Sequence, residues 1–203
     1  NVMNPACQEG LPRQFLDFVT YFAFSQRERV LEAISEMEGS IYGKAASAYM
    51  IHTEDLIRSR DELLNITDVP ANLEPWLSLW TGTVFVLLGQ ISKADIRFAK
   101  AVETAPDDSF RCRVYVNWAG MYLTSNENEN SEVAQHAAAI IEKAMQLDPP
   151  QETKMMLTAN LGLAYKMMGR YDEAAEIFET VRSFNEAQGN MFIVALATSD
   201  IAD

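Results

Sequence analysis

The chain has 203 residues, of which 48% are hydrophobic and 22% charged, and 29 acidic against 16 basic residues give a formal net charge of −13. This composition is typical of a globular protein and not of a disordered chain, and the length suits one domain or a short repeat array. The acid excess argues against binding to a nucleic-acid backbone, and two cysteines cannot form a disulfide framework or a four-thiolate zinc site.

Residues 1–69 are predicted to form an N-terminal helical region. Within residues 12–24, apolar residues at helical spacing predict the first helix. These residues are Phe15, Phe18, Val19 and Phe22. Ser25 and Glu28 have the spacing of a capping box, which predicts a second helix from there to Met37.

The rest of this region continues the helical pattern without a clean repeat signature. One helix or two are expected over residues 41–64, and residues 65–75, which contain two prolines, are expected to be a connector. We therefore interpret residues 1–69 as a helical cap or as degenerate repeats that cover the end of an array formed by residues 70–203.

Residues 75–92 carry no charge over a length near the minimum for a membrane-spanning helix. Proline, glycine and hydroxyl residues interrupt the stretch, and Glu74 and Lys93 flank it closely. This composition does not favour a membrane span, and repetition along the chain gives a better account of it.

Two segments, residues 75–108 and 155–188, repeat one pattern. Each has a glycine, an aromatic residue three positions later and a second glycine after seven, then an alanine twelve positions from the first glycine and a phenylalanine four beyond it. In order, these residues are Gly82, Phe85, Gly89, Ala94 and Phe98 in the first segment, and Gly162, Tyr165, Gly169, Ala174 and Phe178 in the second.

The pattern predicts an antiparallel pair of helices in each segment. Gly82 and Gly162 are expected to let the second helix approach the first closely. Gly89 and Gly169 are expected to end the first helix in the left-handed conformation. Ser92, followed three positions later by an acidic residue, offers a capping box for the next helix.

This pattern resembles the tetratricopeptide repeat, a 34-residue helix–turn–helix unit with small, aromatic and Ala-x3-Phe positions followed by proline. Residues 155–181 match best. The first unit also closes with Ala101 and Pro106, whereas the third has Val181 and Glu186 at those places.

A middle unit lies between these two segments. Its first half contains Gly120, and residues 137–150 resemble the second helix of a unit, with Ala137, Ile141, Ala144 and Pro149 at the expected intervals. A polar insertion at residues 125–132 accounts for the extra length between the halves. A fourth unit is expected to start near Leu196 and Ala197.

The resemblance implies an all-α, right-handed superhelix of antiparallel helix pairs with an N-terminal helical cap. In this family the first helix of each unit lines the concave face. The register places there Trp76, Leu79, Trp80, Thr83, Val114, Asn117, Trp118, Met121, Met156, Ala159, Asn160, Leu163 and Met167.

All three tryptophans of the chain are in this set, and Trp and Met are residues that adaptable binding surfaces favour. The hypothesis is therefore an open groove that receives a peptide or helix, with Trp80, Trp118 and Met156 as anchors. The alternative is that neighbouring helices, or residues 12–64, fill the groove.

One family function is disfavoured. Chaperone-binding members hold a carboxylate with Lys, Arg and Asn on the groove helices. The corresponding positions here are Leu79, Thr83, Trp118, Met156 and Asn160, of which only Asn160 fits.

No phosphate-binding glycine loop, nucleophile elbow or HExxH motif is present in the sequence, so no enzyme activity, metal or cofactor is expected. His52 and His136 are interpreted as surface helix residues. No targeting signal is visible, and free thiols at Cys7 and Cys112 suit a reducing compartment, so a cytoplasmic location is expected.

These observations predict a non-catalytic protein-interaction scaffold that binds a protein or peptide and no membrane or nucleic acid. The alternative is a regulatory segment of a larger transcriptional or signalling protein, because the chain starts at Asn1 and both ends look cut. The acidic residues are interpreted mainly as a solvated convex face, and secondarily as a guide for a basic partner.

Overall fold

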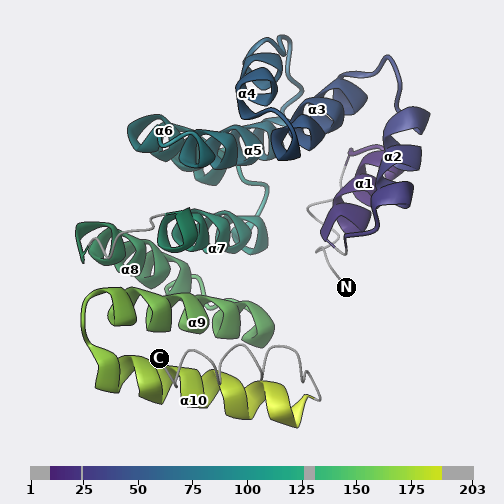
Figure 1. The fold of residues 1–203 in the computed structure, drawn as a ribbon. Coiled ribbons are helices and arrows are strands. Elements are labelled where there is room, and N and C mark those ends of the chain that lie inside the picture. Colours follow the sequence, from purple (N-terminus) through teal and green to yellow (C-terminus); the bar gives the residue numbers. More distant parts are fainter. Residues whose placement is uncertain (1–9, 24, 126–130, 189–203) are drawn as a thin grey trace. The chain divides into compact units, whose positions relative to one another are not determined.

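The computed structural model describes residues 10–23, 25–125 and 131–188, which are helical apart from connecting loops and contain no strand. The expected all-α class is confirmed for this part of the chain (Figure 1). The predictions for Cys7, for Leu196 with Ala197 and for most of the polar insertion lie outside the described residues.

The chain divides into two compact units, residues 1–110 and 111–203. This division differs from the boundary near residue 69 that the sequence suggested. The first unit holds α1 (Arg13–Ala23), α2 (Arg27–Glu36), α3 (Ile41–Met50), the 3-10 helix η2 (Ile51–Thr53), α4 (Leu56–Leu64), α5 (Glu74–Leu87) and α6 (Ile91–Glu103). The second holds most of α7 (Asp108–Ser125), then α8 (Ser131–Met145), α9 (Gln151–Met167) and α10 (Tyr171–Ala187).

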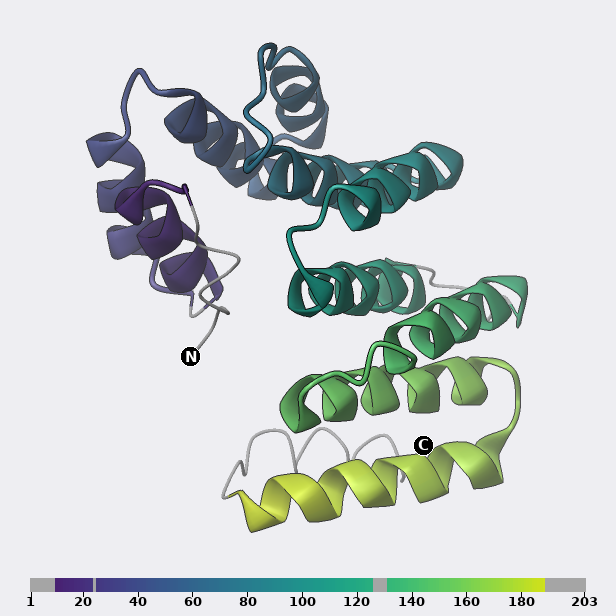
Figure 2. The ribbon, with the colours of Figure 1, turned by 180° about the vertical axis from the view of Figure 1, so that it is seen from behind.

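Consecutive helices pack against each other within each unit. In the first unit the pairs are α1 with α2, α3 with α4 and α5 with α6 (Figure 2). In the second unit α9 packs against both α8 and α10. The two segments that repeat the glycine pattern are thus the helix pairs α5–α6 and α9–α10.

The glycines of the repeated pattern act as predicted. A Cβ atom at Gly82 would lie 2.9 Å from the ring of Phe98, and one at Gly162 would lie 2.7 Å from the ring of Phe178. Gly89 and Gly169 follow the first helix of each pair with φ of +68° and +74°. The close approach of the paired helices and the left-handed helix ends are both confirmed.

Both predicted capping boxes are wrong. Ser25 has φ of +55°, whereas an N-cap residue normally adopts an extended conformation, and Gln26 precedes α2 instead. Ser92 lies inside α6, which starts one residue earlier after Gln90. Among the described residues, side chains that cap helices include Ser40, which accepts a hydrogen bond from the Gly43 amide, Asp55, which accepts one from the Arg58 amide, and Asp107, which accepts one from the Phe110 amide at the start of α7.

The uncharged stretch that starts at Pro75 forms α5, whose residues from Pro75 to Val86 are all buried. Among the described residues, no helix has both the length and the hydrophobicity needed to cross a membrane. The absence of charge from Pro75 to Val86 follows from the burial of this part of α5 on all sides of the helix.

Candidate functional site

The predicted groove positions of the first unit are buried. Trp76 and Trp80 on α5 are 3% and 5% exposed, and Leu79 and Thr83 are buried with them. The ring of Phe15, on α1, lies 5.9 Å from that of Trp76 and 5.7 Å from that of Trp80, measured between centroids. Helix α1 therefore covers these indoles, as in the alternative of an internally filled groove.

Helix α3 completes the cover over Trp80. The ring of Tyr49 stacks on the Trp80 indole at a centroid distance of 4.9 Å with an interplanar angle of 8°. The imidazole of His52 in turn stacks on the Tyr49 ring at 4.5 Å. His52 also hydrogen-bonds through Nδ1 to the Tyr49 carbonyl oxygen. This half-buried histidine is part of an aromatic cluster that packs α3 against α5.

Burial of Tyr49 has a consequence for stability at high pH. Desolvation raises the pKa of the Tyr49 phenol from 10.0 to about 12, although a hydrogen bond with Thr83 acts in the opposite direction. As pH rises, the unfolded chain loses this proton first. The contribution of the neutral Tyr49 phenol to the free energy of unfolding is therefore fully present below pH 10 and is lost as pH approaches 12.

We expect this ionisation to lower the free energy of unfolding by about 1 kcal/mol at pH 11 relative to pH 9, and by about 2–3 kcal/mol in total. Tyr49→Phe removes the titrating proton and keeps the ring, so its stability is expected to fall less over the same interval. Urea unfolding of both proteins at the two pH values measures the difference. Parallel losses in the two proteins would contradict the assignment to Tyr49.

The predicted positions on α7, in the second unit, differ in exposure. Val114 and Trp118 are buried, and the Trp118 ring lies 6.3 Å from that of His136 on α8. Met121 is half-buried and Asn117 is exposed. Helix α7 thus leaves two of these four side chains within reach of solvent.

Helices α7 and α9 are joined by a hydrogen bond between a side chain and the backbone. Nδ2 of Asn160 donates to the carbonyl oxygen of Val116 at 3.3 Å. A Cβ atom at Gly120 would lie 3.4 Å from the same nitrogen, an ordinary van der Waals distance, so this contact does not require glycine. Asn160, the single position that fitted a carboxylate clamp, instead links two helices of the second unit.

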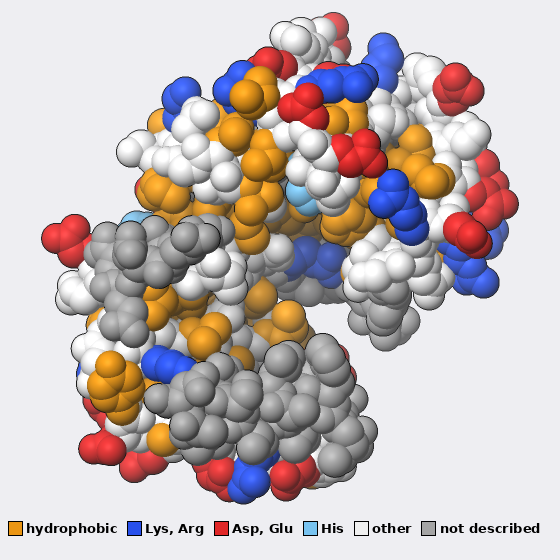
Figure 3. Space-filling model, in the orientation of Figure 1, with side chains coloured by type: hydrophobic (Ala, Val, Ile, Leu, Met, Phe, Trp, Pro, Cys, Tyr) orange, Lys and Arg blue, Asp and Glu red, His pale blue; other side chains and the backbone are white. Residues whose placement is uncertain are grey.

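Of the remaining predicted residues on α9, Ala159 is half-buried, and Met156, Leu163 and Met167 form a partly exposed apolar row, the α9 stripe. Met156 is 57% exposed, and Leu163 and Met167 are half-buried. Their spacing of seven and four residues keeps them on one helix face. On the face of the molecule drawn in Figure 3, hydrophobic side chains reach the surface among charged ones.

Other faces of α9 are occupied within the unit. Leu157 and Ala164 are fully buried, and Gly162 faces Phe178 of α10. The α9 stripe contains no titratable group, so it can contribute apolar contact but no acid, base or nucleophile. It is the part of the predicted groove that is best placed to meet another molecule.

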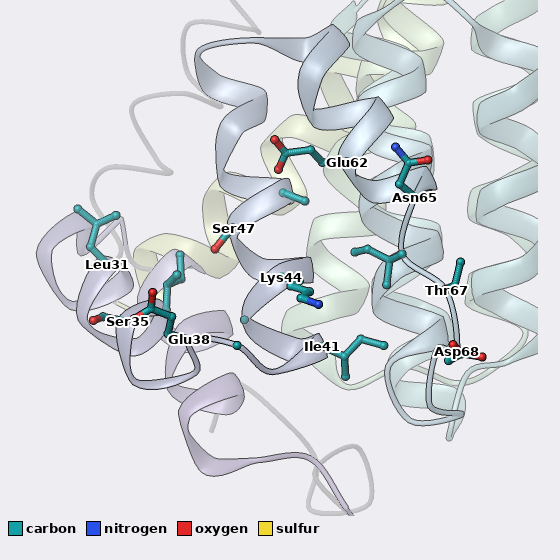
Figure 4. Close-up of a pocket in the computed structure, with 15 residues that line it drawn as sticks. Leu31, Ser35, Glu38, Ile41, Lys44, Ser47, Glu62, Asn65, Thr67 and Asp68 are labelled. Carbon is teal, nitrogen blue, oxygen red and sulfur yellow. The ribbon is translucent and has the colours of Figure 1, made fainter.

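The sequence did not predict a recess that lies in the first unit between α2, α3 and α4 (Figure 4). It has a volume of about 860 Å³. Leu31 of α2, Ile41 of α3 and Asp68 after α4 are among its lining residues. No motif marked these residues, because the recess depends on how far α2 stands from α4.

Within the described part of the chain, no group of three or more His, Cys, Asp or Glu side chains is arranged to hold a metal ion. No protein-family model matches the chain, and no curated protein is significantly similar to it in sequence. The α9 stripe and the recess are therefore the two candidate binding surfaces of the described residues.

Proposed function

We propose that this chain is a non-catalytic protein-interaction module built from helix pairs of the tetratricopeptide type. Two pairs share the same internal contact, Gly82 against Phe98 and Gly162 against Phe178. A glycine that receives a phenylalanine from the next helix supports the resemblance and, with it, a right-handed superhelical arrangement of the pairs.

The α9 stripe is the proposed binding surface for an apolar face of a partner peptide or helix. The observation that carries this proposal is the 57% exposure of Met156 on a helix whose Leu157 and Ala164 are fully buried. Methionine is flexible and polarizable, so it adapts to different apolar partners. Met121 and Asn117 of α7 extend the surface on the neighbouring helix, whereas Trp76 and Trp80 contribute to the core.

A pair of matched variants tests the proposal. Met156→Glu places a charge in the α9 stripe, and Ile96→Glu places the same charge on α6, where Ile96 is 68% exposed. Neither substitution fills a buried site, so both proteins are expected to melt within a few degrees of the wild type.

The wild-type chain and both variants are immobilised and incubated with an extract of cells that express the protein. Proteins retained on each are then quantified by mass spectrometry. We expect at least one protein whose retention falls about tenfold with Met156→Glu and is unchanged with Ile96→Glu, because a buried charge opposes an apolar interface. Equal retention of every protein on the two variants would refute the α9 stripe as the binding surface.

A further inference from the structure

The recess in the first unit, here called the α2–α4 cleft, lies outside the α9 stripe. Helix α2 packs along α1, and α4 packs along α3, which leaves an open space between the two pairs. Figure 4 shows Leu31 and Ser35 of α2, with Glu38 just after it, on one side of this space and Thr67 and Asp68 on the other, with α3 between them. Its volume of about 860 Å³ falls within the range of roughly 300–1,000 Å³ common for binding sites.

Part of the cleft wall is apolar and accessible. Leu31 is 51% exposed, and Ile34, Ile41 and Ile66 are half-buried. These four side chains come from α2, α3 and the segment after α4. An occupant with apolar side chains would remove their surface from water, which is favourable.

The rim of the cleft carries more negative than positive charge. Glu38, Glu62 and Asp68 line the cleft together with one cation, Lys44. Glu62 already pairs with Arg58, whose Nε lies 2.7 Å from its carboxylate. Among the described residues, neither Glu38 nor Asp68 has an ion-pair partner within 4.0 Å, so two carboxylates remain for an occupant.

These two carboxylates lie on opposite sides of the apolar wall. Glu38 follows α2 and Asp68 follows α4, and Figure 4 places Ile41 and Lys44 between them. A partner that matches this arrangement has apolar residues along one face and cations near both ends of that face. The net charge of −13 would also attract such a partner over a longer range.

We propose that the α2–α4 cleft binds a short amphipathic peptide segment whose apolar face is flanked by lysine or arginine. Apolar side chains one helical turn apart contact Leu31, Ile41 and Ile66, and the flanking cations pair with Glu38 and Asp68. An open recess walled by helices suits a helix laid into a groove, a common mode of peptide recognition.

The probe is a synthetic amphipathic peptide of about 14 residues with leucine at positions i, i+3, i+4 and i+7 and lysine elsewhere, labelled for fluorescence anisotropy. A second peptide has glutamate in place of every lysine. The full chain is titrated into each peptide at low and at near-physiological salt. We expect the basic peptide to bind, more weakly at higher salt, and the acidic peptide to show at least tenfold lower affinity.

Conservative variants locate the binding. Glu38→Gln with Asp68→Asn removes both free carboxylates, and asparagine tolerates the φ of +54° at position 68. The matched control is Glu32→Gln with Glu36→Gln, which makes the same charge change at exposed positions of α2 outside the cleft. We expect about a fivefold loss of affinity for the first pair and less than twofold for the control.

Leu31→Ser tests the apolar wall and is expected to weaken binding of the basic peptide severalfold, while Ile96→Ser, at an exposed apolar position of α6 outside the cleft, is expected to leave that binding unchanged. None of these positions belongs to the α9 stripe, so the outcome is independent of the proposed function. Equal losses of affinity in the cleft double variant and in the control double variant would show non-specific attraction to an acidic protein and would overturn the proposal. Self-association of the chain that Glu38→Gln with Asp68→Asn abolishes would identify a second copy as the occupant and would also overturn it.

Discussion

Replacing Trp80 by alanine is expected to lower the free energy of unfolding by about 3–5 kcal/mol, the cost of removing a large aromatic side chain from a core. Trp80 is 5% exposed. Its ring contacts those of Tyr49, Phe15 and Phe18 at centroid distances of 4.9, 5.7 and 5.7 Å. The cavity left by the indole would be lined by side chains from α1 and α3, which cannot all collapse into it.

The measurement is urea unfolding followed by circular dichroism, with Ile96→Ala as the control. Ile96 is 68% exposed, so its truncation is expected to change stability by less than about 0.5 kcal/mol. A Trp80→Ala protein as stable as the wild type that has lost a binding partner would instead make Trp80 an open anchor, as the sequence alone suggested. The contacts of Phe15 and Tyr49 favour the first result.

The helices and their pairing could largely be predicted from local patterns. The spacing that leads from Gly82 to Phe98 recurs from Gly162 to Phe178, and the structure places each phenylalanine directly against its glycine. Such a contact joins residues sixteen positions apart on consecutive helices, so sequence spacing records it. The left-handed conformations of Gly89 and Gly169 follow from the same register.

Helix starts were less predictable, because a capping box specifies residue types but not backbone conformation. Ser25 and Ser92 have suitable acidic residues three positions later, yet Ser25 adopts a positive φ and Ser92 lies within the first turn of α6. The helices α2 and α6 begin after Gln26 and Gln90, whose side chains make no capping hydrogen bond. Packing of each helix against its partner therefore decides where it begins.

The candidate site depended on contacts that the repeat register does not contain. The register identified which face of α5 holds Trp76 and Trp80, but it could not show that Phe15, more than sixty residues earlier, would cover that face. On α9 the same register led to Met156, which is exposed. The α2–α4 cleft left no mark in the sequence, because it arises from the separation of two helix pairs.

The second large effect is expected at the contact between α9 and α10. Gly162→Leu is expected to destabilise the protein by about 3 kcal/mol or more, because a Cβ atom at this position would already lie 2.7 Å from the Phe178 ring and 3.0 Å from Ile177. Gly162→Ala is expected to cost less, about 1–2 kcal/mol, since the better helix propensity of alanine, worth about 1 kcal/mol, offsets part of the overlap.

Gly120→Ala is the matched control, because Gly120 is also a helical glycine but a Cβ there would meet Asn160 at an ordinary 3.4 Å. Its stability is expected to be unchanged or higher by up to about 1 kcal/mol. Adding Phe178→Leu to Gly162→Ala is expected to give a coupling energy in a double-mutant cycle, because the smaller side chain relieves the overlap. Additive losses in that cycle, or equal stability of the two glycine-to-alanine variants, would mean that close approach of α9 and α10 does not require glycine at position 162.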